Sequence, residues 1–233
     1  MDAVILAGGR GSRLGLDKNK SLLNYSAMPL LEHTIKMVDP YVEKIVVVGG
    51  HYVEDLYEYQ QIHKKIEIVC NQQGVVSAIR QGIEAAESDH VLLAFGDEHA
   101  VSPRVQQLEQ SFLDHHAVAA IGYCVRNEFD QHLIHNTFSI EVNNDRVTNT
   151  VEKPRAIVNN MQGTGYAVLS KKILEYIYSE TLHYPAIIQN AIWQGETVVA
   201  VDFCDEYFNN NTQQDLDRMK RYEMLTMGHT DLQ

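Results

Sequence analysis

Short apolar runs alternate with amphipathic segments along the first half of the chain. The runs are rich in Val, Ile and Leu, as buried strands are, and they lie at residues 4–6, 45–48, 66–69, 91–95 and 118–123. The segments between them gather apolar residues on one helical face and predict helices at 30–38, 53–59 and 75–86. Strands that alternate with helices imply βαβ crossovers and a largely parallel sheet. We therefore expect a doubly wound nucleotide-binding unit in this half.

The pattern changes after Asn127. Residues 137–142 alternate between apolar and polar, a turn of Asn143, Asn144 and Asp145 follows, and residues 147–151 resume as a strand, which predicts an antiparallel hairpin. Strands at 165–169 and 197–201 and helices at 171–178, 185–194 and 212–225 are expected after it, with Thr212 as N-cap of the last. The predicted fold is a single-domain α/β protein with a mostly parallel mixed sheet of Rossmann-like kind and a small antiparallel hairpin subregion. Residues 1–227 would form the domain and residues 228–233 a flexible tail.

Composition narrows the function classes. The 233 residues are 45% hydrophobic, and a formal charge of −12 argues against a nucleic-acid binder, which needs a basic face. Cys70, Cys124 and Cys204 show no metal-binding spacing and are expected to be reduced core thiols. The chain opens directly on a strand and has no apolar run long enough to cross a bilayer, so we expect a cytoplasmic protein with no membrane partner. Monomer and homo-oligomer both stay open.

The first strand leads into a loop suited to phosphate. Leu6 and Ala7 precede Gly8, Gly9 and Gly11, and the loop continues through Ser12, Arg13, Lys18 and Lys20. Glycines let backbone N–H groups turn toward phosphate oxygens, while Arg and Lys neutralise their charge. The spacing matches neither the dinucleotide fingerprint nor the Walker loop. A different triphosphate cradle is therefore predicted at the carboxyl end of this strand.

A second candidate follows the strand at residues 91–95. Asp97 comes just after it, and a carboxylate at the end of a strand can hold Mg²⁺ through hard oxygen atoms. Asp97 is the strongest single catalytic candidate in the sequence, and it makes Mg²⁺ the expected cofactor.

These motifs together resemble the nucleotidylyltransferase superfamily that includes the sugar-1-phosphate nucleotidylyltransferases, with a GT-A or Rossmann-like fold. The resemblance covers about residues 2–225, with the motifs in family order. It implies that Leu6, Ala7, Gly8, Gly9, Gly11 and Ser12 wrap a nucleoside triphosphate, and that Arg13 and Lys20 hold its phosphates. Asp17-Lys18 also resembles the molybdenum-cofactor guanylyltransferases, so Lys18 competes with Lys20, which keeps the family spacing to Leu22-Leu23.

The resemblance assigns the remaining site residues. Gln72 and Gly74 fall where the family reads the base, and Asn209 falls where a second metal ligand stands beside Asp97. Glu152 and Lys153, within Glu-Lys-Pro, would bind the hydroxyls and phosphate of a sugar acceptor. Two further acceptor contacts are implied at Gly122 and Thr164.

The implied reaction joins a nucleoside triphosphate to a sugar phosphate or similar small molecule and releases pyrophosphate. An acceptor phosphate oxygen would attack the α-phosphorus, so no general base is needed and catalysis rests on positioning and charge neutralisation. One alternative is a cytidylyltransferase for a non-sugar phosphate or phosphonate such as phosphocholine, since Lys20 and Leu22-Leu23 suit that type too. The glycine that the sugar family places near His135 is absent, which leaves an unusual sugar or cyclitol open. Another alternative is a catalytically inactive nucleotide- or sugar-sensing protein.

Overall fold

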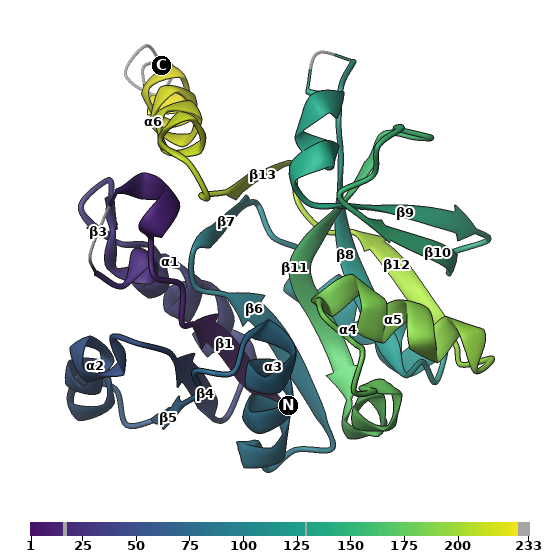
Figure 1. The fold of residues 1–233 in the computed structure, drawn as a ribbon, viewed down its shortest axis with the longest axis horizontal. Coiled ribbons are helices and arrows are strands. Elements are labelled where there is room, and N and C mark those ends of the chain that lie inside the picture. The colour runs from purple at the N-terminus through teal and green to yellow at the C-terminus, as the bar shows by residue number, and fades with distance from the viewer. Residues whose placement is uncertain (16–17, 129, 228–233) are drawn as a thin grey trace.

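A computed structural model describes residues 1–15, 18–128 and 130–227, and within this part the main sheet has nine strands (Figure 1). The tail predicted at 228–233 lies outside the described residues. In spatial order the strands are β5 (Ile66–Cys70), β4 (Ile45–Gly49), β1 (Asp2–Ala7), β6 (His90–Phe95), β11 (Met161–Ser170), β8 (Ala119–Val125), β12 (Val198–Asp202), β10 (Arg146–Glu152) and β9 (Phe138–Asn143). The first four run parallel, β11 is antiparallel to both neighbours, and β8 and β12 are again parallel. Strands β9 and β10 form the predicted antiparallel hairpin.

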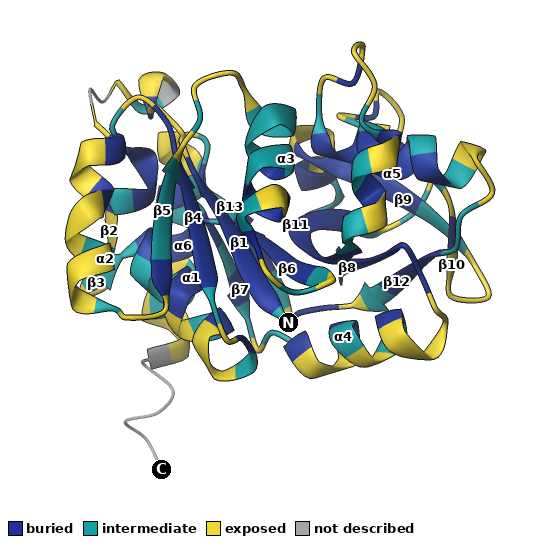
Figure 2. Ribbon diagram, turned by 90° about the horizontal axis from the view of Figure 1, so that it is seen from below, coloured by how far each residue is buried: buried dark blue, intermediate teal, exposed yellow. Residues whose placement is uncertain are grey.

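Helices cover both faces of the sheet. They are α1 (Leu30–Val38), α2 (Tyr57–Ile62), α3 (Val75–Ala85), α4 (Val105–Asp114), α5 (Tyr184–Trp193) and α6 (Gln213–Met227). Helices α3 and α5 pack on one face, and α1 and α4 pack on the other, as Figure 2 shows around the buried strands. No helix in the described ranges is both long and apolar enough to span a membrane.

Two hydrophobic clusters follow from the alternation of side chains along each strand. Ala3 and Ile5 of β1 belong to the cluster beneath α1 and α4, whereas Val4 and Leu6 belong to the cluster beneath α3 and α5. Because both faces are covered, β1 is buried over its full length and reads as a continuous apolar run.

A small antiparallel ribbon stands beside the carboxyl edge of the main sheet. Strand β7 (Glu98–Val101) pairs with β13 (Glu206–Asn209), and this pairing sets Asn209 opposite Glu98. A second ribbon joins β2 (Asn24–Tyr25) and β3 (Met28–Pro29). The β7–β13 ribbon therefore brings two segments far apart in sequence to one place.

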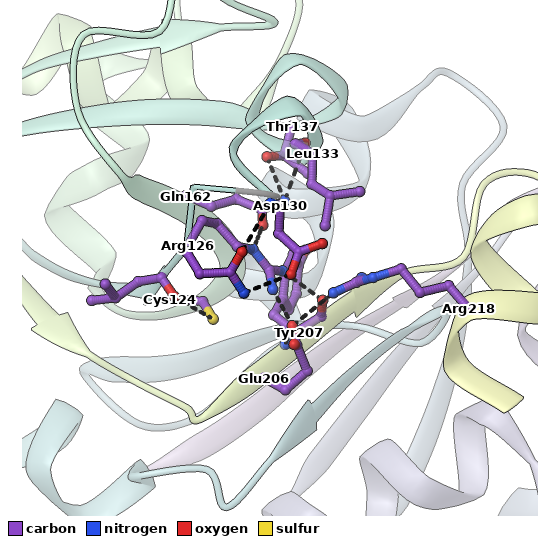
Figure 3. A network of polar contacts seen from close by, with 11 residues as sticks. Cys124, Arg126, Asp130, Leu133, Thr137, Gln162, Glu206, Tyr207 and Arg218 are labelled. Carbon is purple, nitrogen blue, oxygen red and sulfur yellow. Dashed lines mark hydrogen bonds and ion pairs between the residues drawn. The ribbon is translucent and has the colours of Figure 1, made fainter. Parts of the chain in front are cut away.

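Buried polar contacts attach β13 to the sheet (Figure 3). Arg126, which follows β8 and is 3% exposed, donates to Gln162 and to the Tyr207 carbonyl oxygen and pairs with Glu206. Arg218 of α6 reaches the same Glu206 carboxylate at 2.8 Å. A buried guanidinium is stable only when such partners satisfy it. The network thus fixes β13 relative to β8 and β11.

The predicted mixed α/β fold is confirmed, with differences at individual elements. Residues 53–56 form a 3-10 turn before α2, and the helix expected at 171–178 is a 3-10 turn over Lys171–Tyr176. Helix α4 and strands β7 and β13 were not predicted. Cys124 and Cys204 are buried free thiols, but the prediction for Cys70 was wrong, because Cys70 ends the edge strand β5 and is exposed.

Candidate active site

A cavity of about 540 Å³ opens at the carboxyl ends of the parallel strands. Ligands of open α/β sheets bind at this edge, where the loops after the strands converge. One end of the cavity is formed by the loops after β1, β4 and β5, and the other by β9, β10 and the start of α5. The loop after β6, with Asp97, lies on its wall.

The glycine loop after β1 is held by contacts that only small residues allow. A Cβ atom on Gly50 would lie 2.6 Å from the Gly8 carbonyl oxygen, so the loops after β1 and β4 touch backbone to backbone. Gly11 adopts a left-handed φ of 65°, which glycine tolerates best. The Lys20 N–H donates to the Gly9 carbonyl oxygen at 2.9 Å and closes the loop. Backbone contacts at Gly8 and Gly9 thereby fix the loop.

Lys20 and Asp97, which both line the cavity, form an ion pair. Lys20 is 6% exposed, and its Nζ also donates to Asn211 Oδ1 at 2.8 Å. Asn211 in turn donates through Nδ2 to Asn209 Oδ1 at 2.6 Å. Asn210 does not line the cavity but binds the Asp97 carbonyl oxygen through Nδ2 at 3.0 Å. The end of β13 and the two asparagines after it therefore contact both Lys20 and Asp97, through Asn211 and Asn210 respectively.

A second carboxylate, Glu98, lines the cavity next to Asp97. It is 5% exposed, accepts a hydrogen bond from the Gly165 N–H at 3.1 Å and is bonded by the Tyr207 hydroxyl. Burial, with the Asp97 charge as a further cause, raises the pKa of Glu98 to about 8. The two adjacent carboxyls thus sit in different environments, with Asp97 paired to a cation.

The region predicted to read a base is a polar loop between β5 and α3. Gln72 and Gly74 both line the cavity, and Gln72 is exposed. Asn71 shapes the loop by accepting from the Gln73 N–H at 2.9 Å and donating to Gln81 Oε1 at 2.8 Å. An exposed amide beside a fixed backbone is suited to contact a base edge.

At the other end, Glu152 and Lys153 line the cavity after β10. Burial raises the pKa of the Glu152 carboxyl. Lys153 has a left-handed φ of 45°, and its N–H donates to the Thr137 carbonyl oxygen at 2.7 Å. A non-glycine residue held in this conformation is uncommon, and such residues cluster at functional sites. The strained turn presents the exposed Lys153 ammonium at the cavity.

The structure brings most of the predicted residues to one cavity. The predicted residues that line it are Leu6, Gly8, Gly9, Gly11, Ser12, Lys20, Gln72, Gly74, Asp97, Glu152, Lys153 and Asn209. Their catalytic and binding roles stay predictions. The side chain of Arg13 lies outside what the structure describes, as do Leu16 and Asp17.

Three predicted residues do not line the cavity. Ala7 is packed in the core on the α1 face of the sheet. Thr164 is fully buried and donates to the Gly122 carbonyl oxygen at 2.8 Å, so these two residues contact each other. Alternation along β11 explains this, because Gly163 and Gly165 line the cavity and the residue between them points to the opposite face. Gly122 and Thr164 therefore contact each other behind the cavity lining, and their predicted role in acceptor binding stays a prediction.

Several cavity residues were missed by the sequence analysis, and some carried a signal. His51 follows the apolar strand β4 at the same edge as the glycine loop and contacts Arg10, so the strand-end rule used for Asp97 would have found it. Gly50 could not be identified from the sequence, because only the structure shows how closely its backbone approaches that of Gly8. Tyr184 begins a helix whose place against the hairpin no local pattern reveals.

The residues present suit Mg²⁺ with substrate ligands. No group of three or more His, Cys, Asp or Glu side chains that could hold a metal occurs in the described part of the chain. Asp97 and Asn209 offer one carboxylate and one amide oxygen, both of which are satisfied by Lys20 and Asn211. Mg²⁺ keeps several waters and is bound by one or two protein oxygens plus substrate phosphates. Such a pair therefore fits Mg²⁺ that arrives with a nucleotide.

Comparisons with known proteins agree with this geometry. The family model for the MobA-like NTP transferase domain matches residues 3–163. Over 105 residues, 44% of this chain, the sequence is 33% identical to the bifunctional protein GlmU of Francisella philomiragia; the match spans 23% of that protein's length.

Solved structures share the fold across nearly the whole chain. A putative glucose-1-phosphate thymidylyltransferase from Bacillus anthracis, in complex with a sucrose, superposes with a TM-score of 0.82 at 18% identity and 95% coverage of both chains. The inositol-1-phosphate CTP transferase of T. maritima superposes with a TM-score of 0.78 at 21% identity, covering 94% of this chain and 95% of its own. The resemblance seen in the sequence motifs is confirmed, and the chain belongs to the family of MobA-like NTP transferase domains.

Proposed function

We propose that this protein transfers a nucleoside monophosphate from a nucleoside triphosphate to the phosphate of a sugar or sugar-like acceptor and releases pyrophosphate. The observation that carries the proposal is one cavity that holds the glycine loop, the Lys20–Asp97 pair and the Glu152-Lys153 turn together. The first two suit a triphosphate, and the third suits a phosphorylated polyol. Neither half alone would define a transferase.

In the proposed reaction an acceptor phosphate oxygen forms a bond to the α-phosphorus while the bond from that phosphorus to the bridging oxygen of pyrophosphate breaks. The acceptor phosphate is already an anion at neutral pH, so no proton has to be removed. Backbone N–H groups of the glycine loop and Lys20 would hold the triphosphate, and Lys153 would hold the acceptor phosphate. Positioning and charge neutralisation then supply the rate enhancement.

Asp97 and Asn209 would hold Mg²⁺, which supplies charge neutralisation at the α-phosphate when bound. Lys20 is paired with Asp97 and bonded to Asn211 in the free protein, and we expect it to turn toward the phosphates when nucleotide enters. Asp97 thus keeps a cation partner in either state.

The test is pyrophosphate release from each of the four ribonucleoside triphosphates and dTTP with Mg²⁺, against sugar 1-phosphates, inositol 1-phosphate and phosphocholine. We expect release with one nucleotide and one ring phosphate, and a fall of at least about 100-fold in kcat/KM for Asp97→Asn, since charge stabilisation at the reacting phosphate is lost. Asp205→Asn is the matched control, because Asp205 pairs with Arg104 away from the cavity. Full activity of Asp97→Asn would refute the assignment.

A second candidate is a cytidylyltransferase for a phosphate that is not a sugar. The structural similarity to an inositol-1-phosphate CTP transferase keeps a cytidine nucleotide and a cyclitol acceptor within the panel. Release with CTP and phosphocholine alone would favour this candidate. Nucleotide binding without release from any pair would favour a sensing protein.

A further inference from the structure

Tyr184 places a buried hydroxyl at the acceptor end of the cavity. It is 4% exposed, and its ring packs edge-to-face against Phe95 and Phe138, with centroids 6.3 and 5.8 Å away. The hydroxyl has no hydrogen-bond partner among the described residues. Buried tyrosine hydroxyls usually find a partner, because desolvation without one is unfavourable. Tyr184 lines the cavity, so the free protein holds in the cavity wall a buried, unpaired hydroxyl that a molecule pressed against this wall can satisfy.

The position of Tyr184 is fixed by α5 and the hairpin. Gln189 of α5 accepts from the Thr150 N–H at 2.7 Å, and the Thr150 hydroxyl donates to the Pro185 carbonyl oxygen at 2.9 Å. Thr150 lies two residues before Glu152 on β10, so Tyr184 and Glu152 share one rigid support. The two phenylalanine rings prevent the tyrosine ring from turning away. A ligand contact made by Glu152 would therefore come with a defined position of the Tyr184 hydroxyl.

The neighbouring polar groups are already committed to other partners. Glu98 lines the same cavity but binds the Gly165 N–H and the Tyr207 hydroxyl. His183 accepts from the Ala186 N–H through Nδ1. A hydroxyl on a bound ring can both donate to and accept from a phenol, whereas the quaternary ammonium of phosphocholine can do neither. The unpaired phenol therefore favours a polyhydroxylated ring.

We propose that Tyr184 determines acceptor specificity by hydrogen bonding through its hydroxyl to a ring hydroxyl of the phosphorylated acceptor. This inference rests on the proposed function and narrows its acceptor to a polyol ring phosphate. Sites built to bind a hydroxyl reject analogues that lack it far more strongly than apolar pockets reject an added group. Tyr184 would thus exclude deoxy and aliphatic phosphates.

The first experiment measures the melting temperature of the free protein. Tyr184→Phe removes a hydroxyl that has no partner, so we expect the melting temperature to rise by about 2–4 °C. Tyr176→Phe is the matched control, because the Tyr176 hydroxyl donates to Glu196 outside the cavity at 2.5 Å and its loss should lower the melting temperature. A lower melting temperature for Tyr184→Phe would show that the hydroxyl is already satisfied, and would overturn the inference.

The second experiment compares kcat/KM for the active acceptor and its monodeoxy analogues. In the wild type we expect one analogue to lose about 10-fold or more, and we expect Tyr184→Phe to treat that analogue and the parent alike. Tyr176→Phe should keep the wild-type discrimination. An equal loss on every acceptor would make Tyr184 structural and overturn the inference while the proposed function stands. Turnover of phosphocholine alone would overturn the polyol class, and silence of every pair in the wild type would overturn the proposed function itself.

Discussion

In the free protein, Lys20 and Asp97 pair with each other, and the proposed reaction would use both side chains. Lys20 is almost fully buried, and an unpaired ammonium there would be strongly unfavourable. Asp97 supplies the counter-charge, and Asn211 supplies a further acceptor at 2.8 Å. The pair is thus a resting arrangement in which each side chain has the other as its partner until the triphosphate or the metal binds.

Replacing Asn209 tests the metal assignment at the level of one atom. Asn209→Asp would replace the amide of the proposed metal site by a carboxylate, and an added charged ligand strengthens Mg²⁺ binding. We expect the Mg²⁺ concentration for half-maximal activity to fall at least about 3-fold. Asn144→Asp, in the exposed turn of the β9–β10 hairpin, adds the same charge away from the cavity and should change nothing. An unchanged Mg²⁺ dependence for Asn209→Asp would remove Asn209 from the metal site.

Single residues were predictable from the sequence where they directly follow a strand of the parallel sheet. Asp97 and the glycine loop each follow a buried strand of the parallel sheet, so the strand-end rule placed them at one edge. Thr164 was misplaced because the face to which a residue points depends on register, and β11 is the antiparallel strand within the sheet. No local sequence pattern identifies Tyr184, which begins α5, since its partners Phe95 and Phe138 come from the distant strands β6 and β9.

At the level of elements, substitutions at two glycines separate an effect on the cavity from an effect on core packing. In Gly50→Ala the new Cβ would lie 2.6 Å from the Gly8 carbonyl oxygen and would displace the glycine loop. We expect KM for the nucleotide to rise roughly 10- to 100-fold, because small displacements of binding groups have large effects. Gly82→Ala would bring a Cβ within 2.3 Å of Val4 in the core between α3 and β1. It should lower the free energy of unfolding by about 1–2 kcal/mol and leave KM unchanged. The same KM for the nucleotide in Gly50→Ala and Gly82→Ala would contradict the assignment of the glycine loop to nucleotide binding.

The polar network around Arg126 predicts a separate effect on β13. Arg126→Ala would remove the Arg126 donor from Gln162 and from the Tyr207 carbonyl oxygen, and would leave Arg218 as the cation that contacts both that oxygen and Glu206. We expect a loss of about 3 kcal/mol in the free energy of unfolding, measured with urea. Arg104→Ala, which removes an exposed pair with Asp205, should cost under about 1 kcal/mol. Equal losses of unfolding free energy in Arg126→Ala and Arg104→Ala would mean that the burial of Arg126 adds nothing to stability.

At the scale of the whole molecule, the two ends of the cavity come from different parts of the sheet. The predicted parallel half carries the glycine loop and the loop after β5, while the hairpin and α5 form the other end, where we propose that the acceptor binds. The sequence patterns predicted both halves because the buried strands, the helices between them and the hairpin each leave a local periodic signal. The β7–β13 ribbon was missed because its strands lie about a hundred residues apart, and a long-range pairing of short strands leaves no periodic signal. That ribbon is what sets Asn209 opposite Glu98, the residue after Asp97.

Because nucleotide, metal and protein would meet only in the folded state, their binding should stabilise the whole molecule. A ligand at 100 times its dissociation constant adds about 2.7 kcal/mol, which for a chain of this size raises the melting temperature by roughly 5–10 °C. We expect this shift with the active nucleotide and Mg²⁺, and a smaller one when EDTA removes the metal, since the phosphates then face Asp97 without a bridging cation. In Asp97→Asn the shifts with and without EDTA should converge, whereas Asp205→Asn should behave as the wild type. Equal shifts of the melting temperature with and without EDTA in the wild type would mean that nucleotide binding does not depend on the metal. Binding would then be assigned to the glycine loop and Lys20 without Mg²⁺.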